Sequence, residues 1–449
     1  MWSDRARYMC VFAAALLSFS ALHAQSIALD RARLPAELAP LDDDALARIA
    51  RMSPRTPLAV DATNRVADDT RAAQLGHRLF FDKRLSPAGV SCATCHEPAR
   101  AFTDGRALAR GIATVRRNAP SVLDSARRRW NGWDGKHDSV WSQALGPIEH
   151  PDEMGGDRTT LVRIVRDDAD LLARYQAIFG AMPALLAATP NDPLAKAASP
   201  SAAHSLQWFA LDEATRAAIN SVTANLLKSI GAYERLLLTG DTALDRLVAA
   251  LKRDTPNDPA LTELNPSALR GLATFVGRGG CFQCHRGAEF TDEEFHNIGL
   301  TGANGRVPDD PARLTAIEFL QGNPWNCAGE FSDAPEAPKA HMVRGLKRAP
   351  ELFGQFRTAP LRGVALTAPF MHDGRFASLE EVIHFYNTLE GASAVGHHGE
   401  MVLEPLGLDA AGEADLVAFL RSISASLAKS EWMQDPLTTP VRSEGIATP

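Results

Sequence analysis

The sequence has little that would favour a membrane-spanning, nucleic-acid-binding or disulfide-rich protein. After residue 22 it contains no run of about 18 apolar residues, so we expect no membrane span in the mature chain. Its 47 basic and 54 acidic side chains give a formal net charge of −7, which argues against nucleic acid as a partner. Only six of the 449 residues are cysteines, and strand-like alternation is scarce. These absences leave a globular, mainly helical chain that is long enough for two or three domains.

The first 24 residues have the features of an export signal. Arg5 and Arg7 precede a short apolar run over residues 9–22. The expected cleavage point follows Ala24, to within a few residues. We therefore expect a signal peptide over residues 1–24 and a location in the periplasm. Its removal leaves 45 basic and 53 acidic side chains, a formal charge of −8.

Two Cys-x-x-Cys-His pentapeptides carry most of the chemical information. They are Cys92-Ala-Thr-Cys95-His96 and Cys281-Phe-Gln-Cys284-His285. Two thiols at this spacing lie on one face of a helical turn and can add to the two vinyl groups of a haem, while the next residue directs an imidazole to the iron. The pattern predicts two covalent c-type haems, with His96 and His285 as iron ligands. A redox dithiol or half of a zinc site is the alternative, but no thioredoxin-like context or second nearby cysteine pair accompanies either motif.

Composition and periodicity suggest how the chain is divided. Residues 211–238 and 415–423 have helical periodicity, and Ser378 begins a capping box before another apolar helical stretch. We predict a mainly α fold with two cytochrome c-like haem domains, long loops and few or no strands. The two halves form a divergent internal repeat. The predicted segments are an N-terminal arm (25–58), a first haem domain (59–210), a second haem domain (211–430) and a C-terminal tail (431–449).

Several further segments accompany the haem motifs. They are Leu75–Gly105 with Arg84-Leu85-Ser86, Arg117-Asn118-Ala119-Pro120, Trp133-Asp134-Gly135, Gln143–Met154 and Leu361–Asn387. Over roughly residues 70–425 the chain resembles the bacterial di-haem cytochrome c peroxidase family, and more narrowly its MauG-like branch. The resemblance implies that peroxide reacts at the first haem and that electrons arrive through the second.

The resemblance also implies residues for the far side of the first haem. No histidine or methionine lies between His96 and Asn118, so this iron is expected to be open or water-bound at rest, unless a distant side chain folds over it. Glu153 matches the family's distal glutamate and Gln143 the distal glutamine, which makes Glu153 the expected proton carrier in peroxide cleavage. Taken alone, Glu153 would more often be a solvated surface acid.

Trp133 matches the family tryptophan that lies between the two haems, where an indole can relay electrons. Simple packing beside a porphyrin is the alternative interpretation. The family's usual arginine after Trp-Asp-Gly is Lys136 here, which keeps the charge but loses the bidentate fork. A propionate clamp at this position is therefore expected to be looser.

The far-side ligand of the second haem distinguishes the branches of the family. Met371 is a plausible ligand on chemistry alone, because His/Met ligation is common in electron-transfer haems. In the family the ligand lies seventeen positions after the proline of the Thr-x-Pro turn, and counting from Pro369 reaches Tyr386. The resemblance therefore implies a His285/Tyr386 haem of low potential. A core tyrosine bonded to a carbonyl remains the alternative.

The remaining expectations concern calcium, other histidines and one insertion. Asn118, Thr367 and Pro369 match the family's calcium site between the haems, and ligation by oxygen alone suits Ca²⁺. We expect structural or propionate-contacting roles for His296 and His372, and a surface loop at His397-His398. Residues 313–350 form an insertion of no assigned function, in which Cys327 lacks a disulfide partner and is expected to be a buried or idle thiol.

We interpret the sequence as a periplasmic di-haem peroxidase that reduces hydrogen peroxide. Its electron donor would be a small periplasmic cytochrome c or cupredoxin. One alternative is a MauG-like oxidase or maturase acting on an organic or protein substrate. The other is a di-haem electron carrier without peroxidase activity, which two six-coordinate irons would favour.

Overall fold

The computed structural model describes residues 29–253, 257–302, 305, 308–393, 403–425 and 430–438. The expected signal peptide and His397-His398 lie outside these residues. Helices dominate the described part and strands are nearly absent, so the predicted fold class is confirmed. No helix in this part of the chain is long and apolar enough to cross a membrane.

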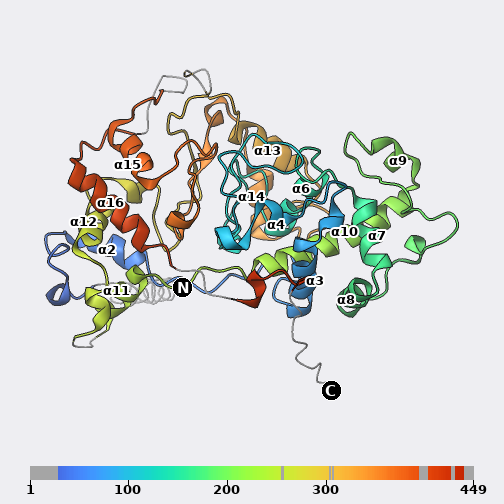
Figure 1. The fold of residues 1–449 in the computed structure, drawn as a ribbon, viewed down its shortest axis with the longest axis horizontal. Helices are drawn as coiled ribbons and strands as arrows, with labels where there is room; N and C mark the ends of the chain where they lie inside the picture. The colour runs from blue at the N-terminus through green and yellow to red at the C-terminus, as the bar shows by residue number, and fades with distance from the viewer. Residues whose placement is uncertain are drawn as a thin grey trace, which may run out of the picture.

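Fifteen α-helices and one two-stranded sheet make up the described architecture (Figure 1). The helices are α2 (Asp43–Arg51), α3 (Thr70–Phe81), α4 (Cys92–Cys95), α5 (Val140–Gln143), α6 (Leu145–Glu149), α7 (Arg158–Asp167), α8 (Ala169–Phe179), α9 (Ser205–Ala210), α10 (Glu213–Glu234), α11 (Ala243–Lys252), α12 (Pro266–Val276), α13 (Arg313–Gly322), α14 (Pro338–Gly345), α15 (Leu379–Thr388) and α16 (Ala410–Ser422). Strands β1 (Phe295–His296) and β2 (Phe356–Arg357) are antiparallel, with Phe295 opposite Arg357.

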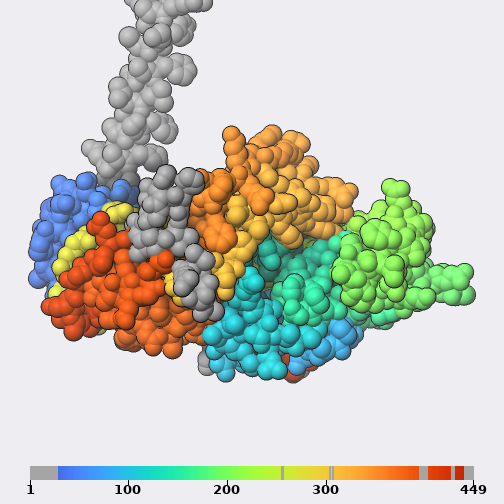
Figure 2. All heavy atoms as spheres, turned by 90° about the horizontal axis from the view of Figure 1, so that it is seen from above, coloured from blue at the N-terminus to red at the C-terminus, as the bar shows by residue number. Residues whose placement is uncertain are grey.

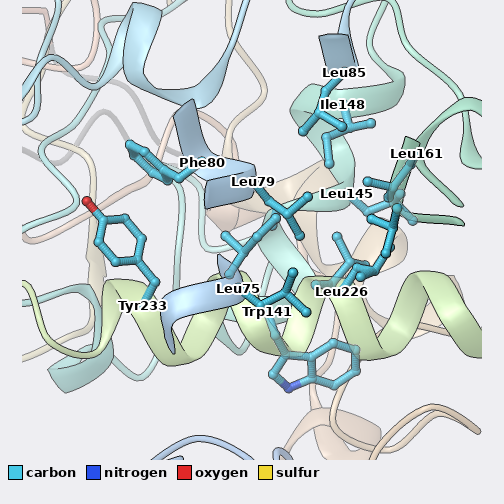
Figure 3. Packing of buried hydrophobic residues seen from close by; sticks show 14 of the residues in the cluster. Leu75, Leu79, Phe80, Leu85, Trp141, Leu145, Ile148, Leu161, Leu226 and Tyr233 are labelled. Carbon is cyan, nitrogen blue, oxygen red and sulfur yellow. The ribbon is translucent and has the colours of Figure 1, made fainter. Parts of the chain in front are cut away.

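The first hydrophobic core forms where α3 crosses α10 (Figure 3). Gly76 lies at the crossing, where a Cβ atom would overlap the backbone carbonyl of Ser229. One turn further along each helix, Phe80 meets Tyr233 edge-on, with ring centroids 5.2 Å apart. The small residue allows the two helices to approach closely, and the aromatic pair then fills the space beside the first haem motif.

The second core repeats this arrangement where α12 crosses α16. A Cβ atom on Gly271 would overlap the backbone carbonyl of Asp415, and one turn further on Phe275 meets Phe419 with ring centroids 5.0 Å apart. The Ser378 hydroxyl caps α15 by accepting a hydrogen bond from the Glu381 N–H. The other half of the expected capping box is shifted by one residue, because the Glu381 carboxylate accepts from the Ala377 N–H. In Figure 1 the α12 and α16 pair lies in the left part of the molecule and the α3 and α10 pair in the right part. The expected internal repeat is therefore a repeat of this helix packing.

The hydrophobic cores do not divide at the domain boundary expected near residue 210. The apolar face of α10 packs with α3, so this part of the chain contributes residues as far as Leu237 to the first core. From Leu244 onward, the next apolar residues belong to the second core. The expected N-terminal arm contributes α2 to the second core, where Leu46 and Ile49 are buried. The core to which a helix belongs depends on the surface that its apolar face packs against. The sequence of the helix alone does not specify that surface.

The C-terminal tail returns to the first unit. After α16 the chain reaches the short helix η10 (Glu431–Met433), which lies beside α3 and α10 (Figure 1). There the Tyr233 hydroxyl donates to the Trp432 carbonyl at 2.7 Å, and the His77 ring nitrogen bonds the Gln434 carbonyl at 2.8 Å. Residues from the end of the chain therefore fasten to the first haem unit.

One buried arginine joins the two units, and a second stabilises the second unit. Arg55 lies between Asp124 of the first unit and Glu289 beside the second haem motif, at 2.6 and 2.8 Å. Arg362 forms a two-pronged pair with Asp245 at 2.7 and 2.8 Å, and both side chains are nearly inaccessible. Bidentate geometry of this kind fixes orientation as well as distance, so these pairs help to set the position of the second haem motif.

Two candidate haem sites

Each motif histidine is oriented by a backbone carbonyl. The Nδ1 atom of His96 lies 3.1 Å from the Phe102 carbonyl oxygen, and that of His285 lies 3.0 Å from the Phe290 carbonyl oxygen. Both phenylalanines are fully buried and have left-handed backbones, with φ of 59° and 53°. A carbonyl can only accept, so Nδ1 carries the proton in each ring and Nε2 keeps its lone pair.

This geometry fits a haem at each motif. Burial lowers the pKa of both His96 and His285, which favours the neutral imidazole that an iron requires. The four motif cysteines are free thiols, and Cys92 and Cys95 occupy the single turn of α4. The donor set therefore comprises two thiols for attachment and one available Nε2 lone pair for the iron at each site.

The loop that carries Glu153 lies beside the first motif. Burial raises the pKa of Cys95 to about 11, and the charges of Asp104 and Glu153 add to the rise. The Ile112 N–H donates to the Glu153 carbonyl at 2.9 Å, and the Cys95 sulfur lies 3.6 Å from the Arg110 carbonyl. Residues 110–112 thus connect the motif to the Glu153 loop.

The Glu153 carboxylate is partly open to solvent rather than enclosed in an apolar pocket. Its side chain is 34% exposed, and its Oε1 atom lies 3.8 Å from Nδ1 of His150. Gln143, the last residue of α5, is half-buried, and its amide has no hydrogen bond among the described residues. The Met154 N–H donates to the Pro147 carbonyl at 3.2 Å, which folds the glutamate loop back toward the segment after Gln143.

Trp133 lies where the two units meet. Its indole N–H donates to the Asn118 carbonyl at 2.9 Å, and its own carbonyl accepts from the Arg357 N–H at 2.9 Å. The Asn118 N–H in turn donates to the His372 carbonyl at 2.8 Å. A continuous set of hydrogen bonds therefore runs from the first unit, through Trp133, to segments that follow the second haem motif.

The insertion packs against this Trp133 segment, which the sequence did not indicate. Arg313, at the start of α13, is buried and donates to the Gly135 carbonyl at 2.7 Å, while its guanidinium lies 3.9 Å from the Phe295 ring centroid. Lys136 lies over the ring of Phe319, also from the insertion, at 5.7 Å. The insertion thus supplies an arginine close to the position where the family's usual one is replaced by lysine.

Cys327 is a buried free thiol within this insertion. Its N–H donates to Asp138 at 2.8 Å, and burial followed by the nearby Asp138 charge raises the thiol pKa beyond its usual range. A thiol of this kind is unreactive because the thiolate is the nucleophile.

Tyr386 faces the second motif from α15. Burial raises the pKa of its phenol well above the usual range, and the nearby Cys281 and Cys284 sulfurs add to the rise. The hydroxyl forms no hydrogen bond with a residue that the structure describes, so no carbonyl partner of the kind expected for a core tyrosine is present there. Within the described fold, the phenol remains available to a group bound at the motif.

The other histidines near the second motif have protein partners. His372 stacks on Phe356 with ring centroids 3.7 Å apart, and burial lowers its pKa to about 4. His296 lies 3.0 Å from Asp292 and close to Cys284. The Cys284 sulfur is the largest cause that raises the His296 pKa to about 9. Burial lowers this pKa, and the Asp292 carboxylate raises it further. A thioether carries no charge, so haem attachment leaves Asp292 as the main cause.

The residues expected to bind calcium come from two loops that touch. Asn118 is buried, and its amide nitrogen donates to the Arg106 carbonyl at 2.7 Å, which leaves Oδ1 available. The loop containing Gly374 packs directly on Ala107, close to Thr367 and Pro369 in the chain. Neutral oxygen donors of this kind are compatible with Ca²⁺.

Comparisons with known proteins agree with this geometry. The family profile described as di-haem cytochrome c peroxidase matches residues 70–253. The chain is 29% identical over 383 residues to "Cytochrome-c peroxidase IdrP1" of Denitromonas iodatirespirans, covering 84% of this chain and 87% of that protein. It is 31% identical to "Methylamine utilization protein MauG" of Paracoccus denitrificans (strain Pd 1222), covering 76% and 80%. A crystal structure of a MauG-like protein associated with microbial copper homeostasis superposes with a TM-score of 0.57 at 26% identity, covering 85% and 97%.

Proposed function

The chain belongs to the di-haem cytochrome c peroxidase family, and we propose that it reduces hydrogen peroxide at the haem held by Cys92, Cys95 and His96. A haem at this motif supplies the iron that exchanges electrons with peroxide. The observation that carries the proposal is the contrast between the two motifs. A carboxylate loop lies beside the first, whereas a phenol faces the second.

In this proposal Glu153 moves the proton. Cleavage of peroxide to water requires a proton to move from one peroxide oxygen to the other, departing oxygen. The Glu153 carboxylate accepts the first proton and returns it, while Gln143 holds the peroxide through its amide. Partial exposure of Glu153 lets it exchange protons with water, which supplies the two protons that reduction of peroxide to two waters consumes. The His96 ring, fixed by the Phe102 carbonyl, stays neutral throughout.

The second site is proposed to pass electrons. His285 and Tyr386 would both hold the iron of its haem, and an anionic phenolate would favour oxidised iron, which gives a low potential. Trp133 would connect the sites, since its hydrogen bonds reach both units. The Asn118, Thr367 and Pro369 oxygens would bind one Ca²⁺ that stiffens the same junction. The periplasm is the proposed location, with a small cytochrome c or cupredoxin as the electron donor.

Conversion of an organic or protein substrate is the second candidate. The phenol at Tyr386 supports it, because a low-potential second haem would help the protein to store the oxidising equivalents of peroxide rather than accept electrons from a donor. The similarity to proteins named MauG adds to this support.

One experiment separates these functions. The holoprotein would be mixed with stoichiometric peroxide, and the absorption of both haems followed before a small reduced cytochrome is added. A peroxidase consumes the peroxide and then oxidises the cytochrome at once. A MauG-like oxidase consumes peroxide but oxidises the cytochrome slowly, and a plain carrier leaves the peroxide intact.

A further inference from the structure

An aromatic column leads from the first haem motif to the C-terminal segment. The His96 ring lies 6.4 Å from Phe80, centroid to centroid, and Phe80 lies 5.2 Å from Tyr233 (Figure 3). Tyr233 stacks on His77 at 4.6 Å and lies 6.4 Å from Trp432. The rings therefore follow one another without a gap, from the imidazole that would bind iron to an indole near the surface.

The inner members of the column are sealed and the outer member is not. Phe80 and Tyr233 are inaccessible to solvent and His77 nearly so, whereas Trp432 is half-buried. Burial lowers the pKa of His77 to about 4, so the stacked imidazole carries no charge at neutral pH. The space-filling view shows the cyan and teal segments of the first unit packed beside the second unit in one continuous body (Figure 2).

The equivalent positions of the second unit lack oxidisable side chains. There Phe275 takes the place of Phe80, and Phe419 takes the place of Tyr233. Phenylalanine is far harder to oxidise than tyrosine or tryptophan. The packing requirement is the same at both helix crossings, so packing alone does not explain why the first unit carries a tyrosine and a docked tryptophan.

Proton chemistry identifies which side chain would hold the oxidising equivalent. A buried phenol must release its proton when it loses an electron, yet Tyr233 donates to the Trp432 backbone carbonyl at 2.7 Å, which is not a base. An indole can lose an electron first and release its N–H proton to water afterwards. Trp432 meets that condition because it is only half-buried, so the oxidising equivalent comes to rest on Trp432. Tyr233, which is easier to oxidise than a phenylalanine, would carry it only transiently, with its proton retained.

We propose that Trp432 is a surface oxidation site, fed through Tyr233 and Phe80 from the first haem, at which electron-rich phenols or aromatic side chains of a partner are oxidised. This inference rests on the peroxide reaction proposed above. It adds a second route for electrons that does not pass through Trp133 or the second haem.

The electrons and atoms balance as follows. Reduction of one peroxide to two waters takes two electrons and two protons. Each of two phenols gives Trp432 one electron and releases one proton, and the resulting phenoxyl radicals couple or react further in solution. Without a donor, Trp432 itself loses two electrons and two protons and gains one oxygen atom from water. The net change is then the conversion of tryptophan and peroxide to hydroxytryptophan and water.

The test maps oxidation in the holoprotein. A few equivalents of peroxide are added without a donor, consumption is measured, and peptides are analysed by mass spectrometry. We expect one added oxygen on Trp432, suppressed by a phenol and absent when cyanide blocks the haems. Met433 next to it serves as the internal control, because peroxide in solution oxidises methionine without any haem.

Two variants extend the test. Tyr233→Phe copies the second unit and should lower the modification of Trp432 severalfold. It also removes the hydrogen bond to the Trp432 carbonyl, so unchanged limited proteolysis of the segment, which the His77–Gln434 bond still holds, is the control for docking. Trp432→Phe keeps the ring packing and should lower phenol oxidation severalfold. Consumption of peroxide with Trp432 unmodified, or equal modification in Tyr233→Phe, overturns the inference alone. Failure to consume peroxide overturns both the inference and the proposed function.

Discussion

The two haem units share a frame and differ in what surrounds it. Each has a glycine at a helix crossing, an aromatic pair one turn further on, and a motif histidine bonded to the carbonyl of a left-handed phenylalanine. Beyond that frame, the first unit has the Glu153 loop and the column ending at Trp432, while the second has Tyr386. In the proposed account, the repeated parts would hold a haem at each motif, and the parts that do not repeat would give the two haems different roles.

The strongest way to break this comparison is to remove one proximal ligand at a time. His96→Gly should abolish peroxide consumption, because the iron loses the imidazole that the Phe102 carbonyl orients. His285→Gly should leave the first reaction with peroxide and abolish turnover with a reduced cytochrome. Stopped-flow absorption would follow both. Equal loss of the first reaction in the two variants would show that the units are not specialised.

Replacing the proposed proton carrier should have the next largest effect. Glu153→Gln should slow peroxide consumption by about 10²-fold, since the amide cannot carry a proton, while both haems stay attached. Asp152→Asn is the matched control, because it removes the same charge from the neighbouring exposed position. The assignment fails if Glu153→Gln reacts at the rate of the unaltered protein, or if the control is equally slow.

The shared frame can be tested by crowding its crossings. Gly76→Ala and Gly271→Ala should each lower the free energy of unfolding by roughly 1–3 kcal/mol or more, because the new methyl group overlaps a backbone carbonyl of the facing helix. Gly240→Ala, where a Cβ meets nothing within 4 Å, is the control. Denaturant titration would measure all three. A small effect at only one crossing would show that the helix pairs are not equivalent.

A buried carboxylate of the second unit gives a smaller, pH-dependent effect. Burial would raise the pKa of Asp245, but hydrogen bonds and charge from Arg362 outweigh it and lower the pKa to about 2, against an unfolded value of 3.8. The stabilisation, about 2 kcal/mol, is complete above about pH 5 and is lost as pH falls toward 2.

Asp245→Asn should remove that dependence, whereas Asp241→Asn, at an exposed position, should keep it. Unfolding measured by circular dichroism between pH 5 and 2 would distinguish them. Identical acid profiles for Asp245→Asn and the unaltered chain would contradict the assigned role of the Arg362 pair.

Local patterns predicted the fold class, the haem motifs, the long helix that became α10 and the cap at Ser378. These depend on residues close together in the chain. The partner of α10, the docking of α2 and the return of Trp432 to the first unit depend on which distant surfaces meet, so no local pattern encodes them. Similarly, Arg313 belongs to an insertion, and only the folded chain brings it to the Gly135 carbonyl.

Some features of the candidate sites were predicted from the sequence, and others were missed. The position of Tyr386 came from a family register, and its nearness to Cys281 and Cys284 supports that register. The carbonyls of Phe102 and Phe290 were missed, although the sequence does show a phenylalanine five or six residues after each motif histidine. Backbone oxygens leave no trace in residue identity, and a left-handed phenylalanine is not signalled by its type.

The specialisation of the two units is tested most directly by electron paramagnetic resonance of the ferric holoprotein and its Tyr386→Phe variant. The account predicts one high-spin signal from the first unit and one low-spin signal from the second, with only the low-spin signal altered by the substitution. Two low-spin signals that the substitution leaves unchanged would contradict it.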